Sequence, residues 1–189
     1  SLLIACGIDP KNPTTSSTAS QQTQNIQSEI PQELSPSEVA INENIKNWQS
    51  LDKSPLVMVR LNEKKTVQSF SFGSCAHQKK PQPIWKAVLA QKPDFYLSLG
   101  DTVYASYPED KPLPMAYVLQ VHHPDFQEMR HKVPIIGAWD DHDYGANDGG
   151  SSNPLQTEAK SEYLKHMIND AAKVSPKIRG NYHSFHIGV

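Results

Sequence analysis

The sequence has little of several features that would define a class of protein. Its 189 residues include only two cysteines, Cys6 and Cys75, which are too few for a disulfide framework. No apolar run approaches the roughly 18 residues that a membrane-spanning helix needs. The net charge of -2, without a Lys/Arg stripe carrying interleaved aromatics, gives no sign of nucleic-acid binding. What remains is a chain of the size of one globular domain, long enough to bury a sizeable core.

The first residues predict a lipid anchor and a tether. Residues 1–6 end in Cys6 after a short aliphatic run and resemble the remnant of a bacterial lipobox, whose cysteine receives lipid. A stray apolar pentamer is the alternative. Residues 7–54 start rich in Ser, Thr, Gln, Asn and Pro, a composition that cannot offset its ordering entropy. We therefore expect Cys6 to be the lipidation site of a protein of the bacterial cell envelope, periplasmic or extracellular, followed by a flexible tether.

The rest of the chain alternates between strand and helix signals. Within the tether, 36–51 has helical spacing and begins at a Ser35 or Ser37 cap. In the body, residues 55–189, a strand, a helix and a strand follow within about 35 residues, which predicts a βαβ unit and an α/β fold. His122, His123 and His131 are expected at the surface. We predict strands over 56–61, 67–72, 95–99, the apolar run from 133 and 180–188, and helices over 83–91 (burying Ile84, Ala87, Val88 and Gln91), 115–121, 124–131 and 157–171.

Three of these strands end in residues that bind metals or move protons. The run from Val133 stops on Asp140, Asp141, His142 and Asp143. The strand over 95–99 is followed by Gly100 and Asp101, and the strand over 67–72 by Ser74, Cys75 and His77. In α/β sheets the ligand crevice lies outside the carboxyl ends of the strands, so we expect one convergent site.

The residue types at this site favour metal-assisted hydrolysis. Asp101 and Asp141 supply hard oxygen ligands, and two metals bridged by a carboxylate can activate a shared water against a phosphoryl group. His142 would protonate or orient the departing oxygen. Cys75 favours a softer metal, iron or zinc, in one subsite, unless it is a small buried hydrophobe. Tyr104 is either a phenolate ligand or a packing and stacking group.

Three motifs carry a family resemblance. They are Phe72-Gly-Ser-Cys75 with Gln78, then Pro93 to Tyr104, then Val133 to Gly145 together with Asn147-Asp-Gly-Gly150, and in this order they resemble the alkaline phosphatase D-like (PhoD-like) metallophosphatases. The resemblance covers about residues 70–165. It implies a metallophosphoesterase-like β-sandwich flanked by helices, which hydrolyses phosphate esters.

The resemblance also implies roles for individual residues. Asp101 takes the place of a bridging metal ligand, and Asp141 and His142 stand where the superfamily has a metal-binding Asn and a transition-state-stabilising His. Similar proteins use a cysteine, here Cys75, and a tyrosine to hold iron, with calcium in the second subsite. That tyrosine is Tyr104 or Tyr117. Zinc or another divalent ion is the alternative to these two metals.

The family's later acid and histidine ligands come from a C-terminal half. We therefore expect residues 55–189 to be the N-terminal part of a metallophosphatase domain that is incomplete at its C-terminus. The alternative to an enzyme is a catalytically incomplete homologue that binds cations or a surface partner.

Overall fold

The computed structural model describes residues 33–53, 58–105, 113–167, 180, 184, 187 and 188. The chain divides into two compact units, residues 1–33 and 34–189, and the elements below all belong to the second. The predicted anchor at Cys6, the tether up to residue 32 and most of the predicted strand over 180–188 lie outside the described residues.

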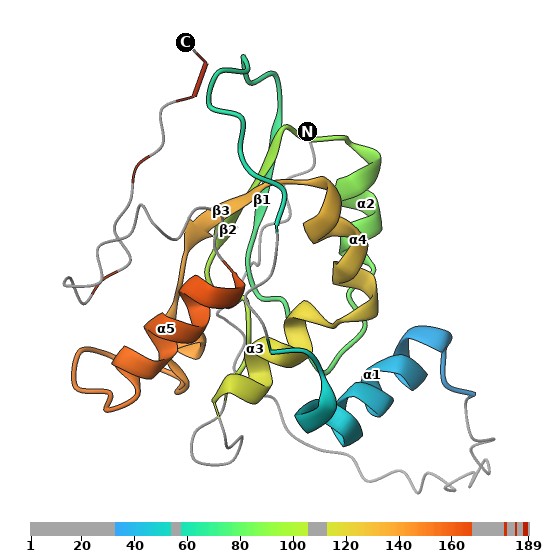
Figure 1. Cartoon of the computed structure of the whole chain (residues 1–189), viewed down its shortest axis with the longest axis vertical. Coiled ribbons are helices and arrows are strands. Elements are labelled where there is room, and N and C mark those ends of the chain that lie inside the picture. The colour runs from blue at the N-terminus through green and yellow to red at the C-terminus, as the bar shows by residue number, and fades with distance from the viewer. Residues whose placement is uncertain are drawn as a thin grey trace, which may run out of the picture. The chain divides into compact units, whose positions relative to one another are not determined.

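A three-stranded parallel sheet organises this unit (Figure 1). Strand β2 lies in the middle, pairing Phe95 with Phe70 of β1 and Tyr96 with Ile135 of β3. The α/β class and the βαβ unit are confirmed, and the described residues contain this one sheet, which is one layer of the expected sandwich. The strands are β1 (Phe70–Gly73), β2 (Phe95–Leu99) and β3 (Ile135–Ala138), with α2 (Ile84–Ala90) between the first two.

At the start of the sheet, one strand prediction was wrong and one was confirmed with a later first residue. Residues 58–61 form no strand, because no neighbouring strand pairs with them in the described part of the chain. Strand β1 begins three residues later than predicted. The Asp94 carboxylate accepts the backbone N–H groups of Gln68 and Ser69, so these groups are satisfied by a side chain instead of a strand ladder.

Helices α2 and α4 (Pro124–Lys132) lie side by side and cover one face of the sheet (Figure 1). Trp85 of α2 packs edge-on against Tyr96 of β2, with ring centroids 5.2 Å apart, and it also contacts Phe126 of α4. The predicted buried face of α2 was wrong, since Ile84 is 47% exposed while Trp85 is 4% exposed. Burying the larger indole removes more apolar surface from water, and its N–H still donates to Gln82 Oε1 at 2.5 Å.

The opposite face of the sheet is apolar and open. Phe70 and Phe72 of β1 are 52% and 62% exposed, and Leu99 of β2 is 49% exposed. Phe70 stacks on Phe95, its register partner, with ring centroids 5.1 Å apart. Parallel sheets are normally covered on both faces, so this face has the character of an interior layer.

The remaining helices pack around α3 (Pro114–Val121), whose side chains from Ala116 onward are all buried. Helix α1 (Pro36–Asn47) begins at Ser35, and a reciprocal capping box with Glu38 confirms the predicted cap. Asn44 of α1 donates to the carbonyl of His122. The other elements are the single turns η1 (Trp48–Ser50) and η2 (Asp141–Tyr144) and the helix α5 (Gln156–His166). Among the described residues, no helix has the length and apolarity to cross a membrane.

His123 corrects the surface prediction for the histidines. It is 1% exposed and caps α4, since its Nδ1 accepts the Asp125 N–H while its Nε2 lies 2.9 Å from the Lys80 carbonyl. Burial lowers its pKa, so the neutral form is favoured. His122 is partly exposed and His131 is exposed, as predicted.

Candidate metal centre

The loop after β1 is tied to the loop after β2 by the main chain. The N–H of Cys75 donates to the Gly100 carbonyl at 3.4 Å, and the N–H of Ala76 donates to the Asp101 carbonyl at 2.9 Å. Cys75 and Asp101 both adopt positive φ, 65° and 51° respectively. These uncommon backbone conformations turn both side chains out of the strand direction at the same edge of the sheet.

A small residue lets the loop after β3 approach as well. Gly100 has φ of 102°, and a Cβ placed on it would lie 2.5 Å from the Asp140 Cβ. A side chain at this position would therefore separate the loop that carries Asp101 from the loop that carries Asp141 and His142.

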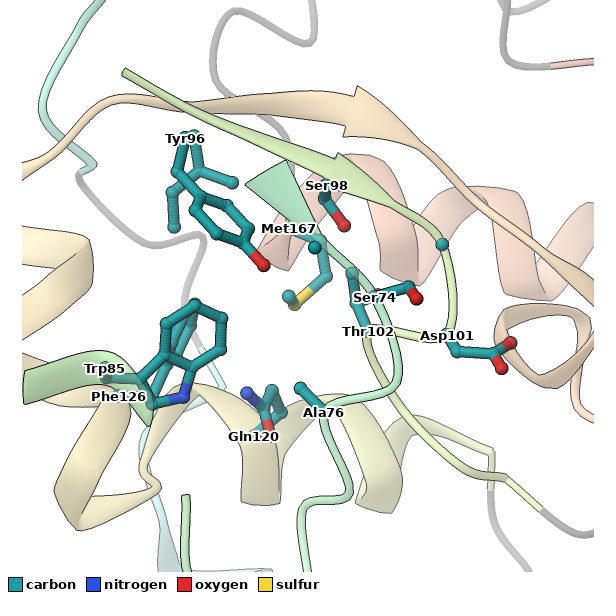
Figure 2. A pocket seen from close by; sticks show the side chains of 13 residues that line it. Ser74, Ala76, Trp85, Tyr96, Ser98, Asp101, Thr102, Gln120, Phe126 and Met167 are labelled. Carbon is teal, nitrogen blue, oxygen red and sulfur yellow. The ribbon is translucent and has the colours of Figure 1, made fainter. Parts of the chain in front are cut away.

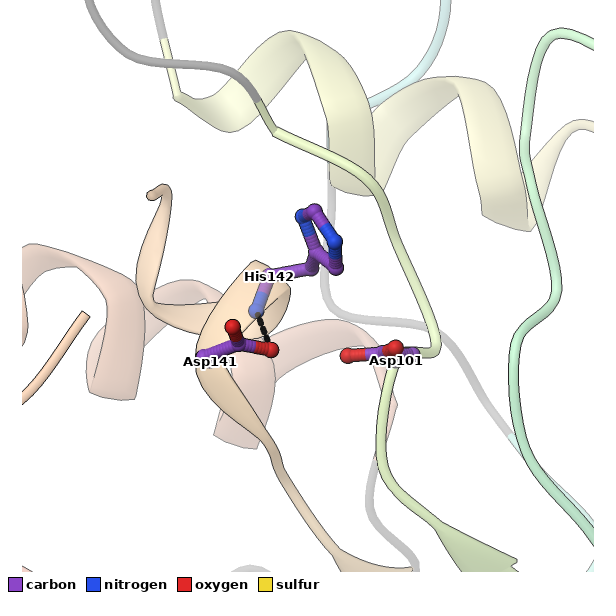
Figure 3. A group of neighbouring side chains, drawn as sticks. All are labelled: Asp101, Asp141 and His142. Atoms are coloured by element: carbon purple, nitrogen blue, oxygen red, sulfur yellow. Dashed lines mark hydrogen bonds between the residues drawn. The ribbon is translucent and has the colours of Figure 1, made fainter. Parts of the chain in front are cut away.

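Asp101, Asp141 and His142 converge in three dimensions (Figure 3). One potential ligand atom from each lies within 4.8 Å of the other two. Asp101 Oδ1 and His142 Nδ1 are buried and have no hydrogen-bond partner. Buried polar atoms are normally satisfied, and a group of two carboxylates and an imidazole that includes unpartnered buried atoms has the donor set of a cation site, so the residues present fit a metal ion.

Asp141 is oriented by the backbone around it. Its Oδ1 accepts the N–H of His142 at 2.9 Å, and its Oδ2 accepts the N–H of Asp148. Asp148 belongs to the Asn147-Asp-Gly-Gly150 segment and has φ of 55°. The Asn147-Asp-Gly-Gly150 segment thus helps to orient a carboxylate of the cluster.

Cys75 and Tyr104 contact the other oxygen of Asp101. The Cys75 Sγ lies 3.6 Å and the Tyr104 hydroxyl 3.3 Å from Asp101 Oδ2. Cys75 is exposed, which does not match the alternative of a buried hydrophobe, and it lies outside the group of three. Burial raises the pKa of Tyr104, and Cys75 and Asp101 raise it further, so its phenol donates to Asp101 unless a cation stabilises the phenolate.

The two candidate tyrosines lie in different surroundings. Tyr117 is fully buried in α3, and its hydroxyl donates to the Asp143 carbonyl at 2.5 Å. Tyr104 is the one beside Asp101. Its ring lies between those of His77 and His142, at centroid distances of 4.9 and 4.3 Å.

Two residues that hold this arrangement were not assigned a role from sequence. Gln78, 1% exposed, clamps Tyr104 by accepting its N–H and donating to its carbonyl, both at 2.8 Å. Asp143, 0% exposed, accepts hydrogen bonds from the loop after β2. Burial raises the Asp143 pKa to about 6 although these hydrogen bonds oppose the shift. The only sequence signal was the occurrence of both residues within the motifs.

A small pocket lies between the sheet and the helices that cover it (Figure 2). Its walls include Tyr96 and Ser98 of β2, Trp85, and Gln120 of α3. Asp101 borders this pocket, but its carboxylate points away from the other labelled side chains (Figure 2). The pocket is therefore mostly an apolar space behind the cluster.

Sheet, loops and cluster together define an α/β protein with a candidate metal centre at the carboxyl ends of parallel strands. A solved structure titled "Structure of PhoD" matches this chain with a TM-score of 0.50 and 16% sequence identity, over 68% of this chain and 30% of that chain. The PhoD-like fold suggested by the motifs is thereby confirmed at the level of structure. No protein-family model matches the sequence. No curated protein matches it either. The chain corresponds to less than a third of the PhoD chain.

Proposed function

We propose that this chain forms part of a metal-dependent phosphoric ester hydrolase of the alkaline phosphatase D type. The observation that carries the proposal is the convergence of Asp101, Asp141 and His142 with two orphaned buried ligand atoms. The fold shared with PhoD supports it. The substrate would be a phosphate monoester or diester, and two or more metal ions would be bound.

Asp101 is suited to bridge two subsites because only one of its two oxygens has partners in the protein. Its Oδ2 meets Cys75 and Tyr104, while its Oδ1 has no partner. Cys75 and Tyr104 would hold the softer metal, with iron favoured, and Asp141 would hold a harder one, with calcium favoured. Bound metal ions lower the pKa of coordinated water and stabilise charge on phosphoryl oxygens.

His142 would act on the departing oxygen. Its Nδ1 is buried and unpartnered, and the Tyr104 ring packs against its imidazole. A ring held in this way can orient the leaving oxygen or deliver a proton to it. The same geometry also allows His142 to be a ligand, and the two roles are separated by a variant in the Discussion.

The test compares an Asp141→Ala variant with the wild type, using an aryl phosphate ester and measuring metal content by elemental analysis. Removing this carboxylate is expected to lower hydrolysis by roughly 100-fold or more, since several kcal/mol of charge stabilisation is lost. Circular dichroism should show that the fold survives. Glu128→Ala, at an exposed carboxylate of α4, is the matched control and should keep full activity. Unchanged turnover in Asp141→Ala would contradict the proposal.

A second candidate function is cation binding without catalysis. It is favoured by the number of ligands in the cluster, because the group of three found in the described residues is fewer than a two-metal site needs. Stoichiometric metal without turnover would support this candidate, whereas paired metals or iron together with turnover would support the enzyme. If the purified protein contained no metal, both the hydrolase and the cation binder would be contradicted. Binding of a surface partner would then be the remaining candidate.

We also propose that the protein is held at the bacterial cell envelope by lipid on Cys6. The small and aliphatic residues before Cys6 and the polar composition that follows support this layout. Mass spectrometry of the membrane fraction should find an acylated Cys6 peptide. A Cys6→Ser variant should move to the soluble fraction, and an unchanged distribution would contradict the anchor.

A further inference from the structure

We propose that Asp143 is a positioning residue, whose buried carboxylate sets the distance between the loop carrying Asp101 and the turn carrying Asp141 and His142. This inference rests on the proposed function, because it concerns the geometry of the same metal centre. Asp143 is 0% exposed and stands outside the group of three candidate ligands. It would therefore act through other residues, without touching the metal or the substrate.

On one side, Asp143 satisfies the backbone that follows Asp101. Its Oδ1 accepts the N–H of Thr102 at 2.9 Å, the N–H of Val103 at 3.1 Å and the Thr102 hydroxyl at 2.5 Å. Thr102 and Val103 are both buried, so without Asp143 their N–H groups would lie in the interior without a partner. This carboxylate thus supports the positive-φ conformation of Asp101, one residue earlier.

On the other side, Asp143 is built into the turn η2. Its Oδ2 accepts the N–H of Asp140 at 2.9 Å, and its own N–H donates to the Asp140 carbonyl at 3.1 Å. Its carbonyl accepts the Tyr117 hydroxyl of α3. The side chain and main chain of Asp143 therefore fix the turn in which Asp141 and His142 are the neighbouring residues.

These contacts make Asp143 a direct link between two loops that the sheet alone does not join. Residues behind a metal centre that orient its ligands typically change metal affinity 10–100-fold when they are mutated. In Asp143→Asn, the amide oxygen can still accept from Thr102. The amide nitrogen then faces the Asp140 N–H, donor against donor, so the turn should shift while the volume of the side chain is kept.

The experiment titrates the full chain with Mn²⁺, a cation that prefers carboxylate and imidazole ligands, and measures free Mn²⁺ by electron paramagnetic resonance. Asp143→Asn is expected to bind Mn²⁺ about 10–100-fold more weakly while its circular dichroism spectrum remains that of the folded protein. The control is Gln120→Met, which removes a buried hydrogen bond to Gln82 and should lower the urea midpoint without changing Mn²⁺ affinity. If Asp143 only stabilised the fold, Asp143→Asn would behave like this control and would bind Mn²⁺ as tightly as the wild type.

The outcomes separate the two proposals. If the wild type binds no Mn²⁺, the metal centre itself is contradicted, and the positioning role falls with it. If the wild type binds and folded Asp143→Asn binds equally well, only the positioning role is contradicted. Should Asp143→Asn fail to fold, Thr102→Val removes only the hydroxyl contact to Oδ1 and keeps the β-branched shape. That variant is then expected to bind roughly fivefold more weakly, and equal binding would overturn the positioning role.

Discussion

Gly100 lies directly against Asp140, and a Cβ at Gly100 would approach the Asp140 Cβ to 2.5 Å. This close approach joins the ends of β2 and β3, which carry Asp101 on one side and Asp141 and His142 on the other. The geometry of the candidate metal centre therefore depends on Gly100, although this glycine has no side chain that could bind a metal.

The first prediction concerns this contact. Gly100→Ala is expected to lower the free energy of unfolding by about 2 kcal/mol or more, because φ of 102° is strained for alanine and the methyl group meets Asp140. The variant should also lose metal affinity. Urea denaturation and metal titration check both effects. Gly150→Ala is the control, since a Cβ there meets nothing within 4 Å, and a similar loss in both variants would contradict the role of the contact.

The second prediction distinguishes the roles of His142. His142→Gln is expected to lower kcat about 10²–10⁴-fold while metal content stays the same, as for a group that moves or positions a proton. Turnover of an aryl phosphate and elemental analysis on the same sample measure the two quantities. Loss of metal in parallel with activity would instead make His142 a ligand, and full activity would give it neither role.

The third prediction concerns the choice of metal. Cys75→Ser should lower iron content by about tenfold and leave the harder metal in place, because a hydroxyl is a poorer ligand than a thiolate for a soft cation. Mass-spectrometric elemental analysis after purification measures both metals. Ser74→Ala, which changes the neighbouring side chain 3.3 Å from the Cys75 sulfur, should retain iron. Equal iron in Cys75→Ser and the wild type would exclude Cys75 as a ligand.

The fourth prediction is a pH dependence of stability away from the metal centre. The Lys65 ammonium, together with the N–H groups of Gln68 and Ser69, lowers the pKa of Asp94 to about 2 from its ordinary 3.8. The stabilisation is therefore fully present above about pH 4 and is lost as the pH falls toward 2. The urea midpoint of Asp94→Asn should lie below that of the wild type at pH 6 and approach it near pH 2.

A surface substitution controls for the change in charge in this experiment. Glu43→Gln, on an exposed position of α1, removes one negative charge far from β1 in sequence, and its urea midpoint is measured at the same two pH values for comparison. A pH-independent gap between Asp94→Asn and the wild type would mean that Asp94 stabilises the start of β1 without ionising.

The local sequence pattern was enough to predict those elements whose sequence signals are unambiguous. Strand β2 was predicted residue for residue, because an apolar run between Pro93 and Gly100 leaves few alternatives. The cap was predicted at Ser35 or Ser37, because a serine at the start of a helical pattern can accept a hydrogen bond from a first-turn N–H group, and the structure selects Ser35. The grouping of Asp101 with Asp141 followed from the rule that parallel strands end at one edge of a sheet.

Only the packed molecule decides which side chain of a local pattern is buried. The helix period placed Ile84 on the buried face, whereas the structure buries Trp85, since that choice depends on Tyr96 and Phe126 across the interface. His123 is buried because a distant carbonyl, that of Lys80, is within reach of its ring. Neither partner can be identified from neighbouring sequence.

The clearest case is the run of acids after β3. From sequence, Asp141 was predicted as the metal ligand among these acids, and no separate role was predicted for Asp140 or Asp143. The turn η2 sends Asp141 toward Asp101 and sends Asp143 into the interior, where Thr102 and Val103 supply its hydrogen bonds. Composition and spacing therefore supply the ligand chemistry. The three-dimensional fold decides which of these carboxylates is buried, because buried charge is tolerated only where donors from distant parts of the chain meet it.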